Sequence, residues 1–441
     1  MGQDTTAVSR YLERNCGMKL FGGSSLARNS GWMFLGQGLS IVSQGVYFIL
    51  LARLLGSAEY GIVVGVVALV SILSQYSTLG SHTVFLRYVS CTPQNFAAYW
   101  GNVLVTTCIL GTIFIGLLTW VGPHFAHSYP WTMVLCVAIG DCIFGQLTVA
   151  AGRVFQSFER LRATAALNLL VNLLKVLVVG VMLWRLHHAS AQQWIITALL
   201  VYLFGACAAI AMVTRSYGKP AFSRRLLSER SGEGIVYALS YSTTGVYNDV
   251  DKVLLGHFGM NAANGVYSMA YRIIDIACTP VNSIQTAAFP LFFKKGAAAG
   301  IQGTGSFALR IVARTAPLSL MIAAAIFLLA PVIPHIVGPS FSGSVSALKW
   351  LCLIPFFRSF HASAGDALTG SGHQKLRLTT QAAAAGFNFL LNLYLIPRFG
   401  WLGAAWSSLA TDGSLGLMNW LVLLILERQC RSVTADLKFA A

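Results

Sequence analysis

Charged side chains inside long apolar stretches are the residues of this sequence best suited to chemistry. The stretches 235–256 and 265–288 contain Asp249, Asp251, Lys252, Arg272 and Asp275. An ionised group among apolar residues is costly, so each needs a functional or a structural reason. Asp249 and Lys252 are three residues apart, as are Arg272 and Asp275, and each pair therefore shares a helix face. Two interpretations stand: a polar wall beside a water-filled cavity, or ion pairs that lock a helical hairpin.

Lys175 is a further charge within an apolar stretch. It lies one helical turn beyond Asn172, on the side of Asn168, and no acidic residue is near it in the sequence. A lysine near the middle of such a segment indicates a hydrated cavity or an anionic ligand. There are two alternatives: the side chain extends to polar surroundings at the end of the apolar stretch, or it has an acidic partner on another helix.

Asparagines repeat at helical spacing in two places. Asn168 and Asn172 are four residues apart, and so are Asn388 and Asn392. Each pair therefore lies on one helix face, where amides can hydrogen bond between helices and hold a bundle together.

The elements that must position these residues are apolar segments of about twenty residues, which recur from Gly31 to Leu426. Hydrophobic residues make up 56% of the chain and charged residues 10%, whereas soluble domains have about 25% charged residues. Crossing the membrane takes about 20 apolar residues in a helix. The sequence thus predicts an all-α, polytopic membrane protein with about twelve transmembrane helices. The predicted spans are 31–52, 61–80, 99–121, 131–151, 164–184, 194–214, 235–256, 265–288, 309–330, 345–368, 379–396 and 401–426.

Short repeated motifs indicate that a six-span unit occurs twice in the sequence. Leu-Leu-Gly occurs at 54–56 and at 254–256, and the paired asparagines and the segments 159–164 and 374–379 match at similar offsets. A unit with an even number of spans repeats in the same orientation, which predicts two parallel six-helix lobes. The predicted division is a cytoplasmic segment 1–28, a lobe 29–214, a basic linker 215–232, a lobe 233–426 and a cytoplasmic tail 427–441.

The net charge of +16 is explained by membrane topology. With the N-terminus inside, the predicted inner segments carry 20 of the 30 Lys and Arg residues, and the predicted outer loops carry Arg53, Arg185 and Arg398. The positive-inside rule then predicts that both termini are cytoplasmic. Membrane lipids, rather than nucleic acid, are the expected partners of this basicity.

Several function classes lack their signatures in the sequence. The nine cysteines are scattered without a CxxC pair, and the histidines show no metal-ligand spacing, so no metal and no disulfide is expected. No glycine-rich phosphate loop is present, and no predicted loop between spans exceeds about twenty residues, which is too short for a folded domain. We therefore expect no cofactor and a transporter rather than an enzyme.

The motifs at both ends of the repeat resemble a known family. Residues 29–80 combine an Asn-x-x-Trp-like start, a first span, the loop ARLLGSAEYG and a second span that ends in glycine. Residues 249–272 read DVDKVLLGHFGMNAANGVYSMAYR, and residues 400–408 read GWLGAAWSS. Together these segments resemble the polysaccharide biosynthesis family of oligosaccharide flippases, related to O-antigen flippases within the multidrug/oligosaccharidyl-lipid/polysaccharide exporter superfamily.

This resemblance implies a function in surface polysaccharide biosynthesis. The chain would move an undecaprenyl-pyrophosphate-linked glycan across the cell inner membrane by alternating access, with glycan polymerase and chain-length machinery as candidate partners. Arg53, Asp251, Lys252 and Arg272 occupy the family's recurrent motif positions.

Two alternatives to the flippase remain. One is a multidrug and toxin extrusion antiporter, although residues 29–52 lack the acidic residue that many of those carry in the first span. The other is a non-transporting membrane component of glycan assembly.

Overall fold

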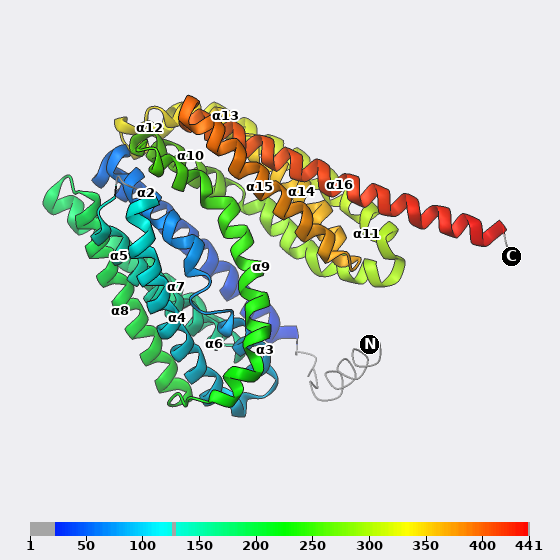
Figure 1. Ribbon diagram of the computed structural model, residues 1–441, viewed down its shortest axis with the longest axis horizontal. Helices are drawn as coiled ribbons and strands as arrows, with labels where there is room; N and C mark the ends of the chain where they lie inside the picture. The colour runs from blue at the N-terminus through cyan, green and yellow to red at the C-terminus, as the bar shows by residue number, and fades with distance from the viewer. Residues whose placement is uncertain (1–22, 126–128, 440–441) are drawn as a thin grey trace. The chain divides into compact units, whose positions relative to one another are not determined.

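The computed structural model describes residues 23–125 and 129–439, and this part of the chain contains helices and no strand. Figure 1 shows the order of the helices along the chain. Their bounds are α2 Gly23–Ser74, α3 Ser81–Cys91, α4 Phe96–Phe125, α5 Trp131–Ile139, α6 Gln146–Ser157, α7 Leu161–Leu186, α8 Ala191–Tyr217, α9 Arg224–His257, α10 Asn261–Ala277, α11 Thr279–Leu329, α12 Ile333–Val337, α13 Ser344–Leu351, α14 Ile354–Gly370, α15 Gln374–Phe399 and α16 Trp401–Phe439.

Two of these helices are broken at glycines, and the breaks explain their length. Helix α2 loses helical geometry at Gly56, where φ is 71°, and α11 loses it at Ala299 and Gly300. Positive φ values are accessible to glycine because it has no Cβ. The breaks divide α2 and α11 into two segments each. Helices α5 and α6 form one rod, α10 continues into the first part of α11, and α13 joins α14. Counted in this way, the described residues form twelve membrane-length segments. The predicted all-helical, polytopic fold is confirmed.

Seven helices of the described part are long and apolar enough to cross a membrane by composition alone. The segments that miss this criterion include α9 and α10, which carry the charged residues singled out above. Polar helices persist at membrane depth where they face protein or a water-filled cavity. The proline-rich region 330–341 consists of short helical turns between α11 and α13.

The chain forms two compact units. Of the described residues, unit 1 contains 23–54, 69–125 and 129–242, and unit 2 contains 55–68 and 243–439. The second limb of α2 thus begins in unit 2, although the sequence placed it in the first lobe. The predicted domain limits at 28, 214, 232 and 426 stay predictions, and residues 1–22 of the first segment lie outside the described part.

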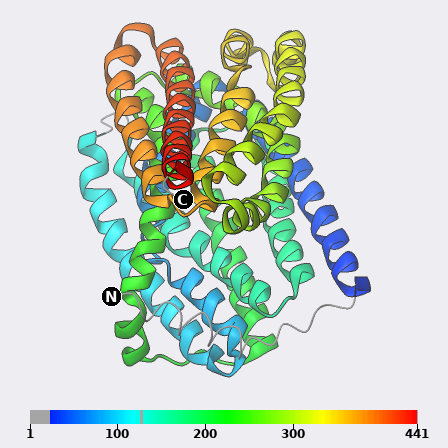
Figure 2. The same ribbon diagram turned by 90° about the vertical axis from the view of Figure 1, so that its right-hand side faces the viewer.

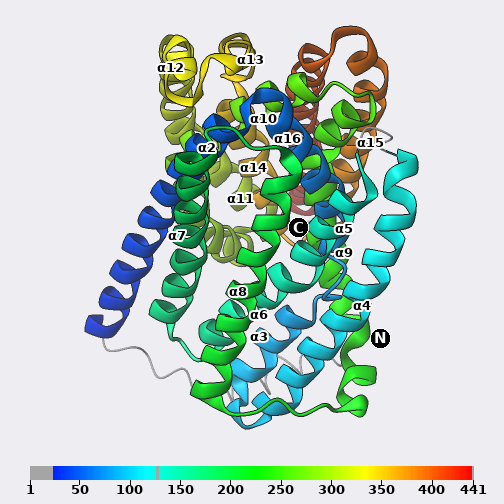
Figure 3. The same ribbon diagram turned by 90° about the vertical axis from the view of Figure 1, so that its left-hand side faces the viewer.

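Each unit contains a helical hairpin that carries one asparagine pair. Helices α7 and α8 pack together in unit 1, and α15 and α16 pack together in unit 2 (Figures 2 and 3). In the second hairpin, Asn388 donates to Thr411 Oγ1 at 3.0 Å, and Asn392 donates to Asn388 Oδ1 at 2.9 Å. Both asparagines are buried, and the bond from Asn388 to Thr411 holds α15 against α16.

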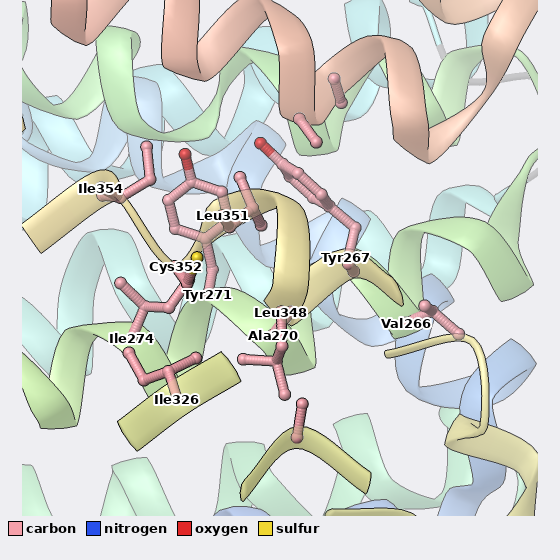
Figure 4. Packing of buried hydrophobic residues seen from close by; sticks show 14 of the residues in the cluster. Val266, Tyr267, Ala270, Tyr271, Ile274, Ile326, Leu348, Leu351, Cys352 and Ile354 are labelled. Carbon is pink, nitrogen blue, oxygen red and sulfur yellow. The ribbon is translucent and has the colours of Figure 1, made fainter. Parts of the chain in front are cut away.

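The core of unit 2 fixes the position of α10. Figure 4 shows Tyr267, Ala270 and Ile274 packed against residues of α11, α13 and α14. Helix α10 also meets the second limb of α2, at Gly61 and Gly265. A Cβ on Gly61 would lie 1.8 Å from the carbonyl oxygen of Asn261, and one on Gly265 would lie 1.9 Å from that of Ser57. The glycines therefore allow backbone-to-backbone packing.

Candidate functional site

Unit 2 contains a cavity of about 510 Å³, which is within the range of small-ligand pockets. Its lining combines charged and amide side chains from helices α9, α10, α11, α14 and α15. The charged ones are Asp249, Lys252, Arg272, Asp275 and Arg358. Four of these five were selected from the sequence, so the hairpin of α9 and α10 brings both predicted pairs to one cavity.

Lys252 is at the centre of a buried charge cluster. Its Nζ lies 3.0 Å from Asp249 Oδ1 and 3.6 Å from Asp251 Oδ1, and it also donates to the carbonyl oxygen of Asn248. The ammonium is 5.5 Å from the centre of the Tyr271 ring. The side chain is 11% exposed, so this lysine is held by its neighbours rather than by bulk water.

Asp251 is more deeply buried than Asp249, with 5% of its side chain exposed. It accepts hydrogen bonds from the Tyr267 hydroxyl and, at 2.7 Å, from the backbone N–H of Lys252. The Tyr267 hydroxyl lies 2.9 Å from Ser408 Oγ, which links α9, α10 and α16 through one network. Asp251 is thus a positioning group beneath the cavity, and Asp249 faces the cavity itself.

In the second predicted pair, Asp275 forms its ion pair with a different arginine from the one that the spacing suggested. Asp275 accepts from Arg358 of α14 at 2.6 Å, a contact between residues 83 positions apart. Arg272, three residues before Asp275, lies near the Tyr60 hydroxyl of the α2 limb in unit 2. Sequence reasoning missed Arg358, although an arginine inside the predicted span 345–368 is the same signal that selected the other charges.

Helix α14 also brings a histidine to this site, close to a buried acid of α16. His361 lines the cavity one turn beyond Arg358, and its Nε2 lies 3.8 Å from Asp412 Oδ1.

Among the charged side chains that line the cavity, three are basic (Lys252, Arg272, Arg358) and two are acidic (Asp249, Asp275). The cavity therefore carries a small excess of positive charge, with each acid paired to a base.

Unit 1 has its own polar cavity, of about 480 Å³. Asn168 and Asn172 line it together with Asp141, and Asn172 donates to Ser40 Oγ of α2 at 2.7 Å. The two asparagine pairs therefore differ: this one borders a cavity, whereas Asn388 and Asn392 are buried between helices.

The remaining predicted residues lie elsewhere in unit 1. Lys175 is adjacent to this cavity but does not line it, because its Nζ donates to the Tyr202 hydroxyl at 3.1 Å and lies 4.3 Å from that ring's centre. Asp141 of the π-helical segment Gly140–Gly145 is close enough to act on it electrostatically, and an acidic partner on another helix stays a prediction. Arg53 is exposed near the end of the first limb of α2 and lines neither cavity.

The arrangement of helices is that of a known class of membrane transporter. A multidrug resistance MATE family transporter of the MOP superfamily, in an inward-facing conformation, matches with a TM-score of 0.70 at 14% identity, over 88% of this chain and 96% of that one. The lipid II flippase MurJ, in an inward closed conformation, matches with a TM-score of 0.67 at 13% identity, over 91% of this chain and 87% of that one. The chain therefore has the fold of multi-pass MOP-superfamily transporters.

The amino-acid sequence gives the family within that class. The model for the family described as polysaccharide biosynthesis protein matches residues 26–295, which is more than half of the chain. This protein belongs to that family, and the predicted resemblance is confirmed. A curated relative, an uncharacterized membrane protein of Methanocaldococcus jannaschii, is 20% identical over 390 residues, covering 81% of this chain and 76% of the relative.

Proposed function

We propose that this protein is a lipid-linked oligosaccharide flippase. It would move an undecaprenyl-pyrophosphate-linked glycan from the inner to the outer leaflet of the cell inner membrane, with both of its own termini cytoplasmic, and would hand the glycan to polymerase and chain-length machinery. The observation that carries the proposal is the group of three cations around one cavity in a member of a polysaccharide biosynthesis family.

The chemistry of the cavity suits a pyrophosphate group. A doubly charged head group cannot cross hydrocarbon unaided, whereas its isoprenoid tail can stay in the membrane. Arg272 and Arg358 offer planar, fork-shaped guanidinium groups, which bind phosphate oxygens in pairs, and Lys252 adds a point charge.

The paired acids give the cavity a way to bind and release this ligand. Asp275 pairs with Arg358 and Asp249 pairs with Lys252, so neither of these two bases faces low dielectric without an acidic partner. Phosphate oxygens can replace the carboxylates as partners of the same bases, and the carboxylates can take them back on release. Such an exchange lowers the cost of carrying an anion and returns Arg358 and Lys252 to their acidic partners after release.

The test compares charge-preserving and charge-removing changes. Arg272→Lys and Arg272→Ala, with Arg358→Lys and Arg358→Ala, would be assayed in a strain that needs this protein for surface polysaccharide. A buried contact between an ionised donor and phosphate contributes about 1.5–3 kcal/mol, so each alanine variant should slow export by roughly 10- to 150-fold. The lysine variants should retain part of the rate.

Protein level in the membrane must be measured alongside the export rate. Normal expression with export at the parental rate in both alanine variants would contradict the cationic cavity and return these charges to a structural role. Arg53 and Lys175, which lie in unit 1, were also predicted to contact the anionic head group. The same comparison of lysine or arginine with alanine at those positions tests this prediction.

A further inference from the structure

We propose that the cavity of unit 1 binds uncharged sugar residues of the transported glycan, an inference that rests on the proposed flippase function. The cavity is enclosed by α2, the π-helical segment Gly140–Gly145, α6, α7 and α8. Its volume of about 480 Å³ is within the range of pockets that take small organic ligands.

The composition of the lining matches a polyhydroxylated ligand. Eleven of the fifteen lining residues have a polar side chain, and most of these are amides and hydroxyls. Amide side chains present donors and acceptors together, and each sugar hydroxyl needs both. These amides come from α2, the turn that follows it, α6 and α7, and they belong to Gln44, Gln75, Gln146, Asn168 and Asn172.

The charge of this lining argues against the pyrophosphate as its ligand. Asp141 is the one carboxylate among the described residues that line the cavity, and none of them is a lysine or arginine. An anionic group there would meet a carboxylate without a lining base to offset it. This is the reverse of the unit 2 cavity, where bases outnumber acids.

A bare metal ion does not fit the same cavity. Cation sites require several oxygens, chiefly of carboxylates, that converge within about 2.6 Å of one point, and the described lining has one carboxylate, Asp141. Within residues 23–125 and 129–439, no three His, Cys, Asp or Glu side chains are grouped as metal ligands would be.

Asp141 is presented to the cavity by an irregular backbone. It lies in the π-helical segment Gly140–Gly145, and such single-turn widenings occur often at functional sites. A Cβ on Gly145 would lie 3.3 Å from the Gly140 carbonyl oxygen and 3.7 Å from Asp141 Oδ1, so the glycine leaves space around the carboxylate. A carboxylate accepts strong hydrogen bonds from neutral hydroxyls without needing a counter-charge in the ligand.

Tyr202 adds an aromatic surface to this site. Its ring lines the cavity, and its hydroxyl is fixed by the donor Lys175, which approaches from outside the lining. Pyranose rings have apolar C–H faces that pack on aromatic rings, while their hydroxyls hydrogen bond around the rim. Lys175 of α7 thus acquires a positioning role through Tyr202.

The experiment measures lipid binding by the purified full-length protein in one detergent. The probes are undecaprenyl pyrophosphate without sugar, and the same lipid carrying one uncharged hexose or one uncharged N-acetylhexosamine. The wild-type protein should bind at least one sugar-bearing lipid more tightly than the sugar-free lipid. Asp141→Asn and Asn168→Ala should each reduce that preference about tenfold, which corresponds to about 1.4 kcal/mol, and leave affinity for the sugar-free lipid unchanged.

Two further variants separate this inference from the proposed function. Leu173→Ala changes a half-exposed residue of α7 outside the lining and should bind every probe as the wild type does. Arg272→Ala in unit 2 should weaken binding of all the lipids, including the sugar-free one.

Each outcome bears on a definite claim. A wild-type protein that binds none of the lipids refutes the flippase function itself. A wild type that binds the lipids without a preference for sugar overturns the inference about unit 1, and so does a preference that survives in both Asp141→Asn and Asn168→Ala. If Asp141→Asn and Asn168→Ala changed only the dependence of lipid binding on sodium concentration, the cavity would be assigned to a cation, and this result would also overturn the inference.

Discussion

Replacing Lys252 with methionine tests whether the charges around the unit 2 cavity form one coupled cluster. Methionine keeps most of the apolar length of the side chain and removes the ammonium that lies 3.0 Å from Asp249 and 3.6 Å from Asp251. Both carboxylates would then lose the same cationic partner. Asp251 would keep the Tyr267 hydroxyl and the backbone N–H of residue 252 as donors.

The burial of the three side chains sets the expected size of the effect. Removing one partner from a buried ion pair costs about 3–5 kcal/mol. Asp249 is 26% exposed and can regain water, and Asp251 retains two hydrogen bonds, so the cost should be near the lower limit. We expect Lys252→Met to lose about 3 kcal/mol. The double variant with Asp249→Asn should recover about half of that, because one of the two uncompensated charges is gone.

Thermal unfolding of the purified proteins in one detergent measures the difference. The scan rate must be held constant, because apparent Tm values depend on it when unfolding is irreversible. A loss of 3 kcal/mol should lower Tm by roughly 6–12 °C on the scale that holds for domains of 150–250 residues. Lys294→Met, at an exposed position of α11, is the matched control.

Two results would refute this reasoning. A double variant no more stable than Lys252→Met would show that the uncompensated charge of Asp249 is not what destabilises the protein. A single variant with the Tm of the wild type would show that the cluster is solvated and adds nothing to stability.

Three further predictions follow from the packing and the topology. Gly265→Ala should lose about 3 kcal/mol or more, because the new Cβ would lie 1.9 Å from a backbone oxygen; Gly180→Ala, which meets nothing within 4 Å, should express and unfold like the wild type. Asn388→Ala should cost about 1 kcal/mol and leave lipid binding intact, since its amide joins two helices; a loss of binding at normal stability would give it a functional role. In a cysteine-free background, single cysteines should react with an impermeant reagent in intact cells at positions 188 and 398 but not at 224 and 375, and labelling at 224 would reverse the predicted orientation.

The sequence alone determined the features that depend on local composition. Apolar segments of membrane length follow from hydropathy, because a helix pairs its own backbone N–H and C=O groups and can therefore cross hydrocarbon. The pairing of Asp249 with Lys252 was also predictable, since residues three apart on a helix are neighbours whatever the tertiary structure. The structure confirms this pair with a distance of 3.0 Å.

Contacts between helices needed the tertiary structure. Asp275 and Arg272 have the same three-residue spacing, yet Asp275 pairs with Arg358, which a different helix brings within 2.6 Å. Lys175 has no acid nearby in sequence, and its neighbour Asp141 comes from another helix as well. Spacing gives the possible partners within one helix, whereas packing decides which side chain from elsewhere comes closer.

The two asparagine pairs show this limit most clearly. Asn168 with Asn172, and Asn388 with Asn392, have identical spacing in apolar helices and are indistinguishable by sequence pattern. The first pair borders a cavity, and the second is buried against α16, where Thr411 accepts a hydrogen bond from Asn388. Whether an intramembrane amide meets water or another side chain depends on what the neighbouring helix presents, and only the folded chain decides that.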